Sequence, residues 1–134
     1  MKTASNLNIE NLDRLIKDLS EEEELGFYMG SYITISPPPF IPLPKNYCGT
    51  ACCIAGFIAI KYLGRSPIEP EYGEYLTSVS EDAAKWLGLS DYDAMELFYA
   101  SNTKMELSCI DRSEAVRTLV KLKEKGEVMW SDSL

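Results

Sequence analysis

The chain has 134 residues, 13 basic and 21 acidic side chains, a net charge of −8, and no histidine. The missing histidine excludes Ser-His-Asp and Cys-His catalytic sites, histidine-ligated metal sites and imidazole pH switches. The excess of acidic residues argues against non-specific binding to nucleic-acid phosphates, which depends on Lys and Arg.

The bulk composition predicts one soluble domain over residues 1–134. An apolar fraction of 46% and this length are those of an ordinary folded domain. The most apolar stretch, Ala51 to Ile60, has ten residues, about half of what a membrane span needs. Charges are scattered through the first residues, unlike a signal peptide. We therefore expect a cytoplasmic protein that does not contact membranes and whose cysteines are reduced.

The first predicted element is an amphipathic helix that extends to about Glu24. Four consecutive acidic residues, Glu21–Glu24, are interpreted as its solvated end, because consecutive side chains point in different directions around a helix. After it, the aromatic and β-branched stretch from Phe27 to Ile35 predicts a short strand near 31–35. The helix is indicated by apolar residues at helical spacing: Leu7, Ile9, Leu12, Leu15, Ile16 and Leu19.

Five of the seven prolines lie between Pro37 and Pro44. Proline lacks an amide donor, so this stretch is expected to be extended or turning rather than helical. We interpret it as a packed surface connection. The spacing of Pro39 and Pro42 also leaves open an SH3-type ligand.

The next predicted helix spans about residues 49–63 and ends at Gly64. Small side chains let neighbouring backbones approach closely, which indicates a buried helix surrounded by others. Those small residues are Gly49, Ala51, Ala55, Gly56 and Ala59.

Capping residues predict two short helices in the second half of the chain. The first runs from Ser80, as its N-cap, to Gly88. The second is capped by Ser90, with Asp93 at the third position as an acidic variant of the capping box.

The last predicted helix begins with the capping-box pair Asp111 and Glu114 and ends at Gly126. A short strand is expected near 127–130. The elements together predict a mainly α fold, a compact single-domain helical bundle around the buried central helix at about 49–63.

The segment richest in potential chemistry surrounds Cys48, Cys52 and Cys53. A cysteine at a helix N-terminus has a stabilised thiolate, which makes Cys48 the candidate reactive thiol. The alternative is that all three cysteines pack as small apolar side chains. Cys48 and Cys52 would share a helix face, but structural zinc needs two ligand pairs from separate elements. We therefore expect no metal and no cofactor.

This segment resembles the nucleophile region of the bacteriocin-processing cysteine peptidases. Those peptidases use a downstream histidine as general base, which this chain lacks, so the resemblance does not extend to their catalytic site. The residues that match are Cys48, Gly49, Ala51 and Cys52.

The acidic residues are concentrated in residues 67–106, whereas residues 31–66 contain none. One interpretation is a set of solvated helix faces; the other is an acidic surface for a basic partner. Residues 80–98 are spaced like a helix-turn-helix unit, but the acids of its second helix would repel DNA. We therefore expect no direct nucleic-acid binding. The candidate contact residues are Tyr72, Tyr75, Glu71, Glu74, Asp91 and Asp93.

Three blocks of the chain resemble a family of small uncharacterised proteins from bacteria and their phages. The first block is Cys48-Gly49-Thr50-Ala51-Cys52-x-Ile54-Ala55-Gly56; the others lie within 87–98 and 115–130. The resemblance implies a shared fold and a phage-related origin, and supplies no mechanism.

From the sequence we expect a non-enzymatic protein that binds another macromolecule, most simply a protein. The alternative is a thiol-dependent enzyme or redox sensor that uses Cys48. Under the first interpretation the motif residues serve packing: they are Cys48, Gly49, Thr50, Cys52 and Gly56.

Overall fold

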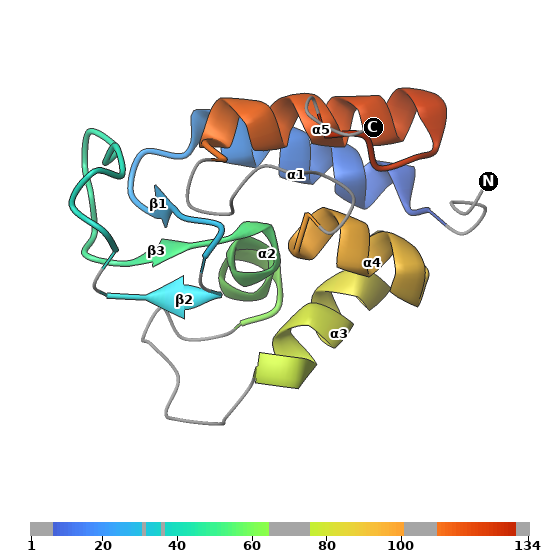
Figure 1. Cartoon of the computed structure of the whole chain (residues 1–134), viewed down its shortest axis with the longest axis horizontal. Coiled ribbons are helices and arrows are strands. Elements are labelled where there is room, and N and C mark those ends of the chain that lie inside the picture. Colours follow the sequence, from blue (N-terminus) through green and yellow to red (C-terminus); the bar gives the residue numbers. More distant parts are fainter. Residues whose placement is uncertain (1–6, 31, 36, 65–75, 101–109, 131–134) are drawn as a thin grey trace.

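The computed structural model describes residues 7–30, 32–35, 37–64, 76–100 and 110–130 (Figure 1). Over these residues five helices accompany one small three-stranded sheet, so the fold is mainly α with short strands. Within these ranges, none of the helices combines the length and the apolar character that crossing a bilayer requires. The elements are α1 (Ile9–Glu21), β1 (Gly26–Phe27), β2 (Ile33–Thr34), β3 (Ala51–Cys52), α2 (Ile54–Tyr62), α3 (Leu76–Leu87), α4 (Asp91–Phe98) and α5 (Arg112–Lys125).

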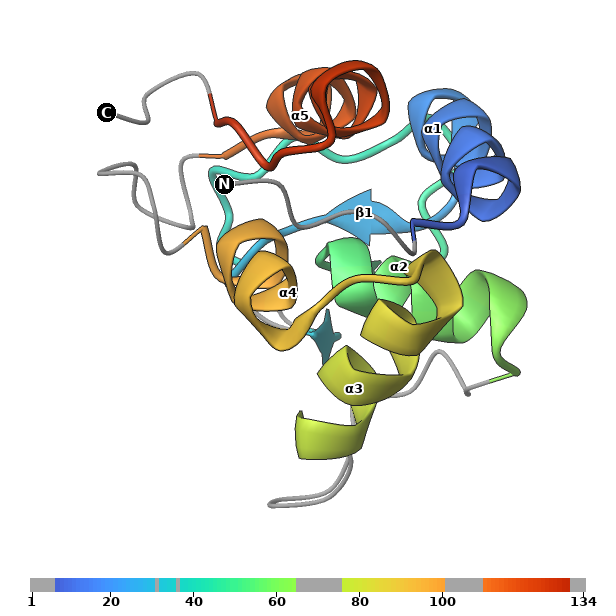
Figure 2. The same ribbon diagram turned by 90° about the vertical axis from the view of Figure 1, so that its right-hand side faces the viewer.

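Helices α1 and α5 lie side by side, although they come from opposite ends of the sequence (Figures 1 and 2). An ion pair of 2.7 Å between Lys123 and Asp13 joins their outer faces. The buried residues of α1 recur at helical spacing, as the sequence predicts. The apolar side chains that the two helices bury are Leu12, Leu15, Leu19, Ala115, Leu119 and Leu122.

The predicted solvated end of α1 is wrong at one position. The helix ends at Glu21, and the carboxylate of Glu22 is buried. It accepts hydrogen bonds from the backbone amides of Glu24 and Leu25 and pairs with Lys61 of α2 at 2.8 Å. Four consecutive acids therefore do not all face solvent, because a cation from another element compensates one of them.

The sheet has the strand order β1-β3-β2, with the last strand in sequence at its centre. Strand β3 pairs in parallel with β1, placing Gly26 opposite Ala51, and antiparallel with β2, placing Ile33 opposite Cys52. The strand predicted near 31–35 is thus confirmed as β2.

Helix α2 begins later than the sequence predicts, at Ile54 instead of about residue 49. The reason is that Ala51 and Cys52 use their backbone groups in the sheet as β3. From Ile54 to Ala59 every residue is buried, and α2 contacts both α3 and α4.

A polar and aromatic cluster joins α1, α2 and α3. The ring of Tyr62 in α2 stacks on Trp86 of α3, with centroids 4.2 Å apart. Its hydroxyl donates to the carboxylate of Asp18 in α1 at 2.6 Å. The side-chain amide of Asn11 in α1 donates to the carbonyl of Trp86 at 2.7 Å.

The capping predictions for α4 and α5 are confirmed. The side chain of Ser90 accepts from the amide of Asp93 at 3.1 Å, and that of Asp111 accepts from the amide of Glu114 at 2.9 Å. Gly126 ends α5 with a φ of +75°, the left-handed conformation that favours glycine.

Two boundary predictions in the second half are wrong. Helix α3 begins at Leu76, so Ser80 lies inside it rather than capping it. Residues 127–130 form no strand; instead, the indole nitrogen of Trp130 donates to the carbonyl of Glu96 at 2.8 Å, which anchors this segment on α4.

Candidate functional site

The candidate thiol Cys48 lies in the connection before β3, not at the start of a helix. Its amide donates to the carbonyl of Glu24 at 2.8 Å, and its exposed side chain points its sulfur at the Thr50 carbonyl, 3.8 Å away. Because α2 begins only at Ile54, its dipole does not act on this thiol as the sequence led us to expect.

Cys52 and Cys53 are buried, on β3 and at the N-cap of α2. Burial raises the pKa of the Cys52 thiol well above its ordinary value and that of Cys53 to about 11. Both thiols are therefore protonated near neutral pH. Cys48 and Cys52 do not share a helix face, and the described part of the chain contains no group of three or more metal-binding side chains.

Gly49 and Gly56 of the cysteine motif are glycines for different structural reasons. Gly49 has a φ of +98° with open space beside it, so it provides a backbone conformation rather than a close contact. Gly56 packs against the backbone carbonyl of Tyr32, where a Cβ atom would overlap the oxygen. Thr50 is buried, and its carbonyl accepts from the amide of Gly26 at 2.9 Å.

The predicted acidic contact surface is only partly within the described residues. Asp91 is exposed at the start of α4. Asp93 is 1% exposed, and its Oδ2 atom has no hydrogen-bond partner among the residues that the structure describes, so this residue is not a surface contact and that prediction is wrong. The helical position explains this, because Asp93 lies on the face of α4 that packs inward. Tyr72, Tyr75, Glu71 and Glu74 lie outside the described residues.

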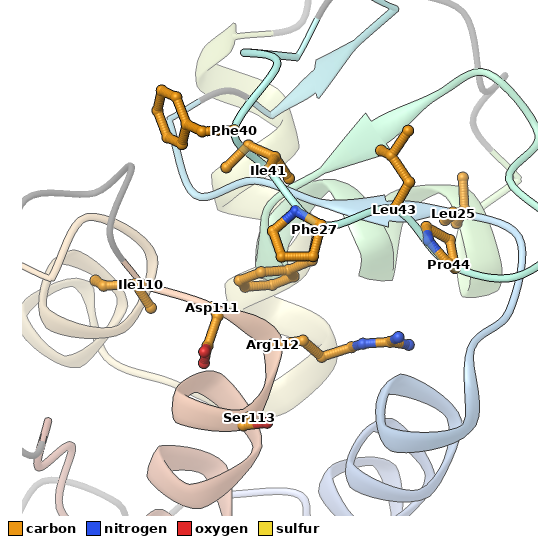
Figure 3. A pocket seen from close by; sticks show the side chains of 11 residues that line it. Leu25, Phe27, Phe40, Ile41, Leu43, Pro44, Ile110, Asp111, Arg112 and Ser113 are labelled. Atoms are coloured by element: carbon orange, nitrogen blue, oxygen red, sulfur yellow. The ribbon is translucent and has the colours of Figure 1, made fainter.

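The structure reveals a groove that the sequence analysis missed, between the proline-rich segment and the start of α5 (Figure 3). Its volume is about 430 Å³, within the usual range for ligand-binding pockets. Eight of its eleven lining residues are apolar, but polar atoms supply about half of its exposed lining, so the groove is mixed in character. The lining residues are Leu25, Phe27, Phe40, Ile41, Pro42, Leu43, Pro44, Ile110, Asp111, Arg112 and Ser113.

A β-turn displays Phe40 at the edge of this groove. The amide of Ile41 donates to the carbonyl of Pro38 at 3.1 Å, so Pro39 and Phe40 are the two central residues of the turn. Proline favours the first of these positions because its ring fixes φ. Ile41 is buried, whereas Phe40 is 66% exposed. The proline-rich segment is therefore anchored, but it also presents an apolar ring outward.

The opposite side of the groove is the first turn of α5, which is fixed to α1. Figure 3 shows the Arg112 side chain extending across the groove towards the C-terminal end of α1. Its guanidinium donates to the carbonyls of Leu19 and Glu22, and Asp111 caps α5. The groove thus has apolar walls and a polar end whose side chains already have defined positions.

The α4 helix has a second exposed apolar feature. Tyr92 and Met95 lie on its outer face, and Tyr99 follows at its C-cap. The sequence pattern alone did not separate these residues from Leu97 and Phe98, which are buried.

Comparisons with known proteins identify no relative of this chain. No protein-family model matches the chain, and no curated protein or solved structure is significantly similar to it. The resemblance to the bacterial and phage family therefore stays a prediction.

Proposed function

We propose that the protein is a non-enzymatic binding protein that receives an apolar segment of a protein partner in the groove beside Phe40. The observation that carries the proposal is the exposed phenyl ring of Phe40 on a proline-restricted turn, at the edge of a groove lined mainly by apolar residues. A large exposed aromatic residue next to a concave apolar surface is typical of interface anchors.

The backbone of this turn is already restricted, so it loses little conformational entropy when a partner binds. Pro38 and Pro39 restrict the backbone before Phe40, and Ile41 is buried after it. A preorganised surface loses less entropy when a partner binds. An apolar side chain of the partner would pack between Phe40 and Ile110, with the polar first turn of α5 at the end of the groove.

We further infer that the chain acts in the cytoplasm. Its partner would be a protein and not a nucleic acid, since the net charge of −8 opposes phosphate binding. The surface would be carried by a helical bundle with α2 as its central member. A phage-related origin rests on the sequence resemblance alone.

A thiol-dependent enzyme or redox sensor is the second candidate function. It is supported by the exposure of Cys48. We place it second because α2 begins too late in the chain to stabilise a Cys48 thiolate through its N-terminus.

The test is photo-crosslinking from the groove in the native host. A benzoyl-phenylalanine at position 40 should capture a defined protein, whereas the same group at exposed Ser20 of α1 should not. Adding Leu43→Ser should reduce the capture by roughly tenfold, because it removes a second groove side chain. Equal capture from both positions, or capture unaffected by Leu43→Ser, would contradict the proposal.

A further inference from the structure

The outer face of α4 is apolar and aromatic where a solvent-exposed helix is usually polar. Tyr92, Met95 and Tyr99 are 64%, 51% and 41% exposed, and their spacing of three and four residues places them on one side of the helix axis. Figure 2 shows α4 on the outside of the molecule, next to α3. These three residues, which we name the α4 stripe, share no member with the groove.

The α4 stripe is held in place by its neighbours. The hydroxyl of Tyr99 is hydrogen-bonded to that of Tyr32, and the two rings meet edge to face with centroids 6.2 Å apart. Trp130 donates to the Glu96 carbonyl, which ties the helix to the C-terminal segment. The stripe is therefore a preformed surface, which lowers the entropy lost when a partner binds.

Helix α4, which carries the stripe, contains acidic residues and no basic one. Of its three acidic residues, Asp93 and Glu96 are buried. Asp91 is exposed next to Tyr92. The Tyr92 hydroxyl hydrogen-bonds to the Glu96 carboxylate, and this bond raises the pKa of that tyrosine. A partner must therefore bring positive charge as well as apolar surface.

We propose that the α4 stripe binds a basic amphipathic segment of a protein partner. Arginine side chains of that segment would stack on the rings of Tyr92 and Tyr99 and pair with Asp91. Its apolar side chains would pack on Met95, whose flexible thioether adapts to irregular surfaces. This surface is distinct from the groove, so the proposal does not depend on the function proposed above.

Two other occupants are less compatible with these residues. A nucleic acid would bring phosphates towards the exposed carboxylate of Asp91, which repels them, in a chain of net charge −8. A second copy of the chain would bring the same carboxylate face to face with its counterpart if the two stripes met. Arginine can stack on the rings of Tyr92 and Tyr99 and also pair with the carboxylate of Asp91, so we favour a basic segment as the occupant.

The test uses a short fluorescent peptide with Leu on one helical face and Arg on the other, titrated into the full-length protein. We expect Tyr92→Ser combined with Met95→Ser to weaken binding about tenfold or more. Asp91→Asn should weaken it roughly threefold, and added salt should weaken it further. These side chains are exposed, so a thermal melt should show that the variants remain folded.

Matched controls separate the α4 stripe from general attraction to an acidic protein. Glu124→Gln removes an exposed carboxylate from α5, and Phe40→Ser alters the groove; both should leave the peptide affinity unchanged. The inference is overturned if Glu124→Gln weakens binding as much as Asp91→Asn. It is also overturned if a peptide with Glu in place of Arg binds equally well, or if the stripe variants lose only self-association.

Discussion

The backbone carbonyl of Tyr32 lies directly against the Cα of Gly56. A Cβ atom at position 56 would overlap the carbonyl oxygen and carbon of Tyr32. The same carbonyl accepts a hydrogen bond from the amide of Cys53 at 3.3 Å. Glycine is therefore required at this position by the approach of two backbones, which holds the start of α2 against the segment before β2.

Gly56→Ala should lower the free energy of unfolding by about 2–3 kcal/mol, because the methyl group would force two backbone segments apart. Gly64→Ala is the control: φ is +76° there, and no atom of the described residues lies within 4 Å of an added Cβ. Only the conformational strain of about 1 kcal/mol therefore applies. Denaturant unfolding measures both. Equal losses in the two variants would contradict the close contact at Gly56.

The ion pair between buried Glu22 and solvent-exposed Lys61 should make stability depend on pH. Burial of Glu22 favours its neutral form, but the hydrogen bonds from Lys61, Leu25 and Glu24 outweigh it and lower its pKa. The hydrogen bond to the Glu22 carboxylate raises the pKa of Lys61. The stabilisation is therefore present above the ordinary pKa of Glu22, 4.5, and is lost as the pH falls through its lowered folded-state value.

Accordingly, Glu22→Gln should reduce the free energy of unfolding by about 1–2 kcal/mol at pH 7, and by less as the carboxylate of the parent protein becomes protonated. Urea unfolding of both proteins across the acidic range measures this difference. A difference that stays constant down to pH 3 would show that the loss does not come from the ionised Glu22 carboxylate.

Thiol labelling should separate Cys48 from the two buried cysteines. In a Cys109→Ser background, we expect the exposed Cys48 to react with a disulfide reagent while the protein is folded. Cys52 and Cys53 should react only when the protein unfolds, because they are buried and their thiolates are disfavoured. Adding Cys48→Ser should abolish the fast phase. A fast phase far above the rate of a free thiol would instead favour the thiol-dependent function.

Removing the N-cap of α5 should destabilise the protein measurably. Asp111→Ala loses the hydrogen bond to the Glu114 amide and should lower the free energy of unfolding by about 1 kcal/mol. Ser113→Ala, at an exposed position in the same turn, should change it by less than about half of that. Thermal melts of the two variants compare these effects directly.

Helix ends were predictable where their signals are local. Asp111, Glu114 and Gly126 define α5 through contacts within a few residues, so their spacing in the sequence is sufficient. The start of α2 was not predictable in this way. Ala51 and Cys52 are compatible with a helix, and only their pairing with the distant β1 and β2 makes them a strand.

For the candidate surfaces, too, features set by neighbouring residues were predictable, whereas features set by distant contacts were not. The prolines correctly indicate a turning segment around Phe40, but its exposure depends on what Ile41 and Ile110 pack against. The capping prediction for α4 is correct, whereas the assignment of Asp93 to the surface is wrong because neighbouring elements cover that side of the helix.

The contact between Arg112 and the end of α1 links the two ends of the polypeptide. The guanidinium of Arg112 donates to the carbonyl of Leu19, a residue 93 positions earlier in the sequence. Helix α1 therefore cannot separate without exposing the buried side of α5, so amide protons in both helices should exchange through one shared opening. A single backbone cut between residues 64 and 76 should accordingly leave two fragments that stay associated.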